Sequence, residues 1–108
     1  MKVGIDIESV KRFSQFKKGD TFIKRIFTKQ EQKYCFSKSI PAIHLAGMYC
    51  AKEAFRKTLE KKYVSFDTIE IKHNQKGKPL IRQKKDTSTY AVSISHTRDI
   101  AIAIVIRK

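Results

Sequence analysis

The sequence predicts an α+β fold: an N-terminal strand, three helical segments, and then antiparallel strands packed on the longest helix. Apolar residues alternate with other residues over positions 2–8, recur at helical spacing over positions 42–61, and form strand-like patterns beyond position 62. Helices and strands are therefore segregated along the chain, which favours α+β over an alternating α/β arrangement. Because the chain has 108 residues and neither linker nor internal repeat, we expect one domain over residues 1–108.

The predicted N-terminal strand has two unlike faces. Val3, Ile5 and Ile7 alternate along it with a second set of residues that includes Asp6 and Glu8. A carboxylate on a central strand costs desolvation energy unless it is paired or binds a cation. Two interpretations stay open: a solvated edge strand, or a pair of carboxylates that holds Mg²⁺ together with phosphate oxygens.

The three helical segments are predicted from capping signals and apolar spacing. The first covers residues 10–19, and the second begins with the capping box Thr28–Glu31 and continues to about residue 36. The longest has Pro41 in its first turn and runs over residues 42–61. Its core-facing side is expected to carry the apolar residues that recur four positions apart, Ala51, Phe55 and Leu59.

Four strands complete the predicted fold, at residues 64–71, 79–81, 91–95 and 100–106. A tight turn at Asn74–Gly77 separates the first two, and a hairpin turn at His96–Asp99 separates the last two. The continuous β-branched run of the last strand is typical of a buried strand.

The chain is strongly basic, with 24 Lys and Arg against 10 Asp and Glu and a formal net charge of +14. Such a charge fits nucleic acid, an anionic membrane, an acidic protein or a polyphosphate ligand. A small basic RNA-binding module is the alternative that charge alone favours. Against it, no aromatic platform is interleaved with the basic residues, and it gives no reason for the acids Asp6 and Glu53. We therefore expect no nucleic-acid partner.

The cysteines and the lack of long apolar segments bear on location. Cys35 and Cys50 lie in apolar helical segments at a spacing that matches no zinc motif, which indicates free thiols in a reducing compartment. No secretion signal follows Met1, and no apolar run is long enough to span a membrane. We therefore expect a cytoplasmic protein with no membrane partner.

The longest helix carries one candidate site. Glu53 and Lys57 lie one turn apart, a spacing that suits either a surface ion pair or a metal–phosphate site. Lys52 and Arg56 are expected to form a basic stripe beside them.

The segment Val92–Thr97 carries another. Ser95 and His96 are neighbours on a strand and point to opposite faces, so His96 is badly placed to activate Ser95. A structural turn or a phosphate-contacting hydroxyl cluster is therefore favoured over a catalytic triad.

Together these motifs resemble those of the holo-acyl-carrier-protein synthases, short single-domain bacterial members of the 4′-phosphopantetheinyl transferase superfamily. The matching stretches occur in that family's order: Gly4–Glu8, Phe27-Thr28 with Glu31, Ala46-Gly47, Ala51–Phe55, Gly77–Pro79 and Val92–Thr97. The resemblance implies transfer of 4′-phosphopantetheine from coenzyme A to a serine of apo acyl carrier protein, in fatty acid biosynthesis. The products would be holo acyl carrier protein and adenosine 3′,5′-bisphosphate. A non-catalytic binder of carrier proteins remains an alternative.

The resemblance also implies roles for single residues. Asp6 and Glu53 would hold the catalytic Mg²⁺, and Lys57 would complete the catalytic set. The coenzyme A contacts would come from Lys52, Lys57, His96 and Thr97. Because the attacking serine belongs to the carrier protein, its proton acceptor stays open between Glu53, a hydroxide on the metal and a nearby water.

Partners and assembly are implied in the same way. Arg12 and Arg25 would engage the acidic acyl carrier protein, and the chain would form a homotrimer with active sites between subunits. Two departures from the family affect coenzyme binding: Met48 stands where the family usually has arginine, and Thr58–Tyr63 replaces a glycine-rich loop. We expect Lys61 and Lys62 to supply the missing phosphate contacts.

Overall fold

The computed structural model describes residues 1–60 and 63–108, and it confirms the predicted α+β class. Lys61 and Lys62, the expected phosphate contacts, lie outside the described residues. The elements along the chain are β1 (Lys2–Ser9), α1 (Val10–Phe13), α2 (Thr21–Ile26), α3 (Lys29–Phe36), α4 (Pro41–Lys57), the 3-10 helix η1 (Phe66–Thr68), β2 (Ile69–His73), β3 (Pro79–Gln83), β4 (Tyr90–His96) and β5 (Ile100–Arg107).

The helical half departs from the prediction in length and number. The first predicted helix ends at Phe13 rather than near Gly19, and the unpredicted helix α2 follows it. Helix α4 ends at Lys57, because Thr58 closes its last turn and donates its hydroxyl to the Phe55 carbonyl (2.7 Å). The predicted capping box of α3 and the predicted proline in the first turn of α4 are both confirmed.

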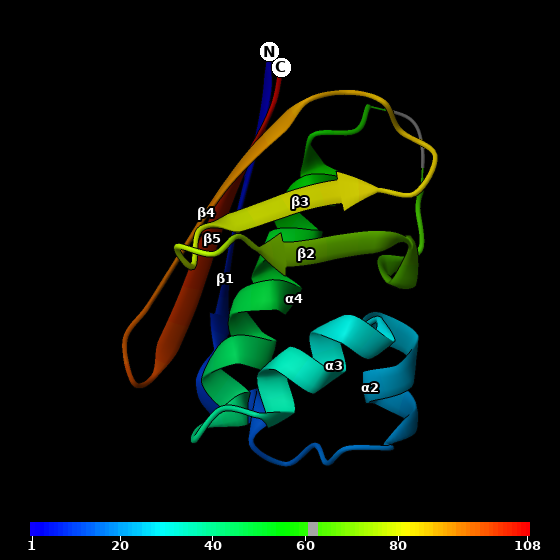
Figure 1. Ribbon diagram of the computed structural model, residues 1–108. Coiled ribbons are helices and arrows are strands. Elements are labelled where there is room, and N and C mark those ends of the chain that lie inside the picture. Colours follow the sequence, from blue (N-terminus) through cyan, green and yellow to red (C-terminus); the bar gives the residue numbers. More distant parts are fainter. Residues whose placement is uncertain (61–62) are drawn as a thin grey trace.

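Helix α4 lies between two separate sheets (Figure 1). One sheet has the antiparallel order β1–β5–β4, and the other is the antiparallel pair β2–β3. Helices α2 and α3 lie together beside β2, on the side away from β3, and the start of β1 lies beside the end of β5 (Figure 1). In the part of the chain that the structure describes, no helix combines the length and apolar character needed to cross a bilayer.

Strand β1 presents its acidic face to α4 and leaves its apolar face uncovered. Gly4 and Asp6 pair with Val105 and Ala103, residues of β5 that are buried beneath α4. The uncovered face carries Val3, Ile5 and Ile7, which are 60%, 53% and 60% exposed. A strand that covers the core would ordinarily place these apolar residues inward.

The expectation of a buried final strand is wrong for one of its two faces. On β5, Ala101 and Ala103 pack beneath α4, whereas Ile100 and Ile104 are exposed on the other face. Their β-branched side chains are thus the continuation of the uncovered face of β1, because Ile5 pairs with Ile104. The sheet is covered by α4 on one side only within the described residues.

Close approach of α4 to β1 requires glycine at position 4. A Cβ atom at Gly4 would lie 1.9 Å from the Ala54 carbonyl oxygen and 2.9 Å from Lys57 Cβ. We therefore expect Gly4→Ala to lower the free energy of unfolding by about 3 kcal/mol or more, because helix and strand must move apart. Urea denaturation measures this loss, with Ser9→Ala at the exposed end of β1 as the control. A Gly4→Ala protein as stable as the control would contradict this packing.

Candidate functional site

Asp6 is the carboxylate that the fold places most unusually. It lies in the middle of β1 and faces α4, and its side chain is 13% exposed. One oxygen, Oδ1, is 3.4 Å from Lys57 Nζ, whereas Oδ2 is buried and has no hydrogen-bond partner. A buried carboxylate oxygen without a partner carries a desolvation cost, and this cost is typical of sites that bind a cation.

Glu8, Glu53 and Asp6 all act on one buried thiol, that of Cys50. Asp6, Glu8 and Glu53 each add to the pKa of the Cys50 thiol, which burial together with these charges raises to about 12. Burial also raises the pKa of Glu8, and the charge of Asp6 adds to that rise. The structure therefore brings Glu53 of α4 and the acidic face of β1 to one buried thiol.

The side chain of Lys57 contacts β1 and does not pair with Glu53. Its ammonium donates to the Ile5 carbonyl at 2.7 Å and lies beside Asp6, while about half of its side chain remains exposed. The carboxylate of Glu53 is instead 3.7 Å from the Arg56 guanidinium. A hollow of about 210 Å³ opens at this edge of the sheet, and its lining residues are Ile5, Asp6, Ile7, Lys57 and Ile102.

The donor set fits a magnesium ion in part. Mg²⁺ prefers oxygen ligands and is commonly held by one or two carboxylates, with waters and substrate phosphates at its other positions. The unpartnered Oδ2 of Asp6 is such a ligand, and Glu53 is a carboxylate of the facing helix that acts on the same thiol as Asp6. Among the described residues, no three His, Cys, Asp or Glu side chains form a complete metal site.

Lys52 is placed differently from the expectation that it contacts the coenzyme. Its side chain is wholly buried, and Nζ donates to the Ile26 carbonyl (2.6 Å), the Phe66 carbonyl (2.9 Å) and Glu31 Oε1 (2.6 Å). All three hydrogens of the ammonium are thus used inside the protein. The interpretation of Lys52 as a coenzyme ligand is therefore wrong, and the residue instead joins α4 to α3 and η1.

The expected basic stripe of Lys52 and Arg56 is wrong, because groups of the protein itself engage both cations. Arg56 donates to the Val64 carbonyl at 2.9 Å, and its guanidinium lies 3.3 Å from the centre of the Phe66 ring. Neither cation is therefore free to neutralise a phosphate. The ion pair of Lys52 with Glu31 is buried. Burial raises the pKa of Glu31 and lowers the pKa of Lys52, because it disfavours the charged form of each group.

The two arginines expected at the carrier-protein surface differ in their surroundings. Arg12 pairs with Glu8 at 2.9 Å, and its guanidinium lies 5.0 Å from the centre of the Tyr49 ring. Arg25 is exposed near the end of α2. Arg12 lies on α1, within the first predicted helical segment, whereas Arg25 lies on the unpredicted helix α2.

His96 and Thr97 lie at the predicted hairpin turn between β4 and β5. The Thr97 hydroxyl oxygen accepts from the amides of Asp99 (3.2 Å) and Ile100 (3.1 Å), so it shapes the turn. His96 lies beside two residues that sequence reasoning missed, His44 and His73, around one cavity. They come from three different elements, and no spacing along the sequence indicates that they meet.

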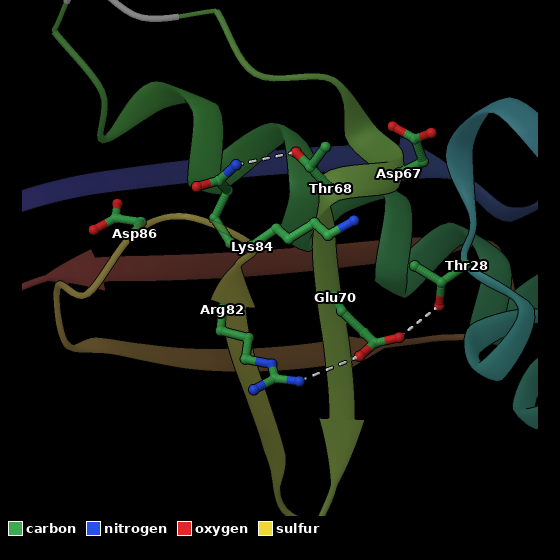
Figure 2. A pocket seen from close by; sticks show the side chains of 8 residues that line it. Thr28, Asp67, Thr68, Glu70, Arg82, Lys84 and Asp86 are labelled. Atoms are coloured by element: carbon green, nitrogen blue, oxygen red, sulfur yellow. Dashed lines mark hydrogen bonds and ion pairs between the residues drawn. The ribbon is translucent and has the colours of Figure 1, made fainter.

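A second, polar hollow of about 420 Å³ lies where β2 and β3 meet the start of α3 (Figure 2). Here Glu70 accepts from the Thr28 hydroxyl at 2.9 Å and lies 4.0 Å from Arg82. The hollow shares no lining residue with the one beside Asp6. The hydrogen bond between Thr28 and Glu70 joins the start of α3 to the hairpin.

Comparison with known proteins identifies the class to which this fold and site belong. The chain belongs to the 4′-phosphopantetheinyl transferase superfamily, whose family model matches residues 2–105. The resemblance inferred from the motifs is thereby confirmed.

More particular similarities lie within that superfamily. The chain is 40% identical over 110 residues to a holo-[acyl-carrier-protein] synthase of Geobacillus sp. strain WCH70, with 96% of this chain and 92% of the relative covered. It is 35% identical over 114 residues to the synthase of Caldicellulosiruptor saccharolyticus, with 96% and 93% covered.

Solved structures give the same result. The holo-(acyl-carrier-protein) synthase of Bacillus anthracis, in complex with CoA (3′,5′-ADP), has a TM-score of 0.85 and 31% identity, with 98% of this chain and 94% of that chain covered. The Helicobacter pylori synthase in complex with coenzyme A has a TM-score of 0.84 and 31% identity, with 98% and 99% covered.

Proposed function

We propose that this chain transfers 4′-phosphopantetheine from coenzyme A to a serine of apo acyl carrier protein. The serine oxygen bonds to the pantetheine-side phosphorus of the coenzyme, and the bond from that phosphorus to the bridging oxygen breaks. Adenosine 3′,5′-bisphosphate leaves with the electron pair, and the serine loses its proton. The observation that carries this proposal is the buried, unpartnered oxygen of Asp6, beside Lys57, in a chain similar over nearly its whole length to holo-[acyl-carrier-protein] synthases.

The proposed roles follow from charge and position. Asp6 and Glu53 would hold Mg²⁺, which when bound neutralises the negative charge of the coenzyme's phosphates. Lys57, half exposed at the mouth of the hollow, places a further positive charge there. Phosphoryl transfer depends mainly on positioning and on neutralisation of charge, so a site without a nucleophile of its own suits this reaction.

One assay tests the proposed function. The full chain is incubated with coenzyme A, Mg²⁺ and apo acyl carrier protein, and the mass of the carrier is measured. We expect the carrier to gain the phosphopantetheine mass, and we expect no gain when the carrier's acceptor serine is replaced by alanine. Binding of the carrier without any gain in mass would instead support a non-catalytic binder.

We propose that the carrier protein is acidic and that Arg12 and Arg25 lie in the surface that docks it. The net charge of +14 and the exposure of Arg25 support this proposal, because opposite charges speed association. Arg25→Glu should weaken carrier binding several-fold in low salt and much less in high salt, since salt screens exposed charges. Surface plasmon resonance measures the effect, with Lys108→Glu as a control of equal charge change. An equal loss in both variants would assign the effect to net charge and contradict a role for Arg25.

We propose that the uncovered face of the sheet is a subunit interface and that three copies assemble through it. Its exposed apolar side chains are Val3, Ile5, Ile7, Ile100 and Ile104, and a contiguous apolar surface of this kind ordinarily marks an interface. Ile5 and Ile7 also line the hollow beside Asp6. A neighbouring subunit on this face would therefore reach the rim of the proposed active site.

The interface proposal predicts a change of oligomeric state. Ile5→Glu places a charge in the middle of the apolar face and should convert the trimer to monomers, as measured by sedimentation velocity. Leu80→Glu is the matched control, because Leu80 is equally exposed but lies on β3, outside this face. A wild-type chain that sediments as a monomer, or an Ile5→Glu protein that remains a trimer, would contradict the proposal.

We further propose that residues 1–108 act as one domain and that the enzyme works in the cytoplasm. Cys35 and Cys50 are buried free thiols, which suits a reducing compartment.

A further inference from the structure

All three histidines of the chain line one cavity. His44 of α4, His73 of β2 and His96 of β4 surround a hollow of about 240 Å³. The ring centres of His44 and His96 lie 6.4 Å apart. Tyr34 of α3 joins the third ring to them, because it stacks on His73 with centres 4.1 Å apart and meets His44 edge-on at 5.7 Å.

The surroundings of His44 and His73 disfavour the charged form of these two rings. Burial lowers the pKa of His44 and of His73 below the ordinary value of about 6.5, and the positive charge of Lys38 lowers both further. The charges of His73 and His96 also lower the pKa of His44. The Lys38 ammonium lies 4.5 Å from the centre of the Tyr34 ring, at the edge of this group.

No counter-charge stands in the cavity. Besides the three histidines and Tyr34, its lining residues are Ile43, Gly47, Met48, Gly77, Pro79 and Ile94. None of these residues is acidic, so the lining supplies no negative charge to balance protonated imidazoles. Among the described residues, no three His, Cys, Asp or Glu side chains are placed to hold a metal ion. An anion is therefore the ligand that these convergent imidazoles fit.

The rest of the lining limits the kind of anion. Ile43, Pro79 and Ile94 give the cavity apolar walls next to its imidazoles. A nucleotide matches both features of the cavity. Its base and ribose suit apolar walls, and its phosphates suit hydrogen-bond donors. Met48 contributes no charge to this lining, so the imidazoles are its only groups that can become cationic.

We propose that His44, His73 and His96 form a phosphate receptor that gains its positive charge as the nucleotide end of coenzyme A enters, so that binding takes up protons. The inference rests on the proposed function and deepens it. His44 and His73 become substrate-binding residues, and the affinity for coenzyme A becomes dependent on pH.

The direction of this dependence follows from linkage. A bound phosphate raises the pKa of each imidazole above its value in the free protein. The extra affinity is therefore fully present below the pKa of the free protein, and it is lost as the pH rises through the pKa of the complex. A rise of one unit for one imidazole corresponds to about tenfold in affinity.

Calorimetric titration of the full chain with adenosine 3′,5′-bisphosphate tests the proposal directly. Runs at pH 6.0, 7.0 and 8.5, in buffers of different ionisation enthalpy, give both the affinity and the number of protons taken up. We expect the affinity to rise about tenfold from pH 8.5 to pH 6.0, with net proton uptake near pH 7. The double variant His44→Gln, His73→Gln should lose most of the pH dependence. Lys33→Gln, at an exposed lysine of α3 outside the cavity, should keep the wild-type pH dependence.

A second measurement does not depend on the folding of any variant. The chain has three histidines, so its imidazole proton resonances can be followed one by one in wild-type protein. We expect two or more of them to titrate at higher pH when adenosine 3′,5′-bisphosphate is bound. Unchanged titration midpoints, an affinity that does not change with pH, or a double variant with the wild-type pH dependence would overturn the proposal.

The two proposals fail in distinguishable ways. If wild-type protein binds the nucleotide with proton uptake but never modifies the carrier, the proposed function is wrong and the proposed phosphate receptor is supported. If it modifies the carrier and binds the nucleotide without proton uptake, the receptor is wrong and the proposed function stands.

Discussion

Asp6→Asn is expected to lower the rate of phosphopantetheine transfer by about 10²–10³-fold or more, because a neutral amide no longer holds a divalent cation or balances its charge. The fold should tolerate the change. Oδ2 of Asp6 is buried without a partner, so removal of its charge relieves a desolvation cost. We expect the free energy of unfolding to stay the same or to rise by up to about 1 kcal/mol.

The combination of lost activity and kept stability is what identifies a functional carboxylate. Transfer is measured by the mass of the carrier at saturating Mg²⁺, and stability by urea denaturation of the same preparations. Asp67→Asn is the control, since Asp67 is exposed in the polar hollow of Figure 2 and lies outside the proposed site. Transfer near the wild-type rate by Asp6→Asn, or its loss only together with unfolding, would remove Asp6 from the catalytic set.

Lys52→Met is expected to have the largest effect on stability, about 3–5 kcal/mol, because it leaves the carboxylate of Glu31 buried without its counter-charge. Both side chains are wholly buried, and Nζ of Lys52 has three partners. A loss of this size approaches the whole stability of many small domains. Circular dichroism during urea denaturation measures it, and Lys33→Met on the exposed side of α3 should change little.

A second substitution separates lost charge balance from lost packing. Glu31→Gln in the Lys52→Met background removes the uncompensated charge, while its amide oxygen can still accept one of the hydrogen bonds from Thr28 and Ile71. The double variant should therefore be more stable than Lys52→Met alone, a coupling that a double-mutant cycle measures. A double variant less stable than the single one would show that packing, rather than charge, dominates.

Local signals in the sequence predicted much of the fold. The alternation of β1, the capping box at Thr28 and the turn ending at Gly77, whose φ is +84°, each depend on near neighbours in the chain. Helix α2 was missed because it has only six residues, with no side-chain hydrogen bond at its start and one buried apolar residue. Its place is fixed by packing against η1, a contact between distant parts of the chain.

The candidate site was predicted less completely. The motif match drew attention to Asp6, Glu53 and Lys57, but only the structure places the acidic face of β1 against α4. Lys52 was misassigned because a lysine on an amphipathic helix ordinarily lies in solvent, whereas here Glu31 of another helix draws it into the core. The histidine cavity is likewise a product of tertiary packing.

The pairing of β1 with β5 has a consequence for how the protein forms. Asp6 is synthesised well before residues 100–107, with which its strand pairs within the described chain. Contacts between segments so far apart in sequence form late, since a long loop must close before they are gained. During translation β1 therefore has no partner strand until β5 has left the ribosome, and the proposed metal site around Asp6 is expected to form in the last step of folding.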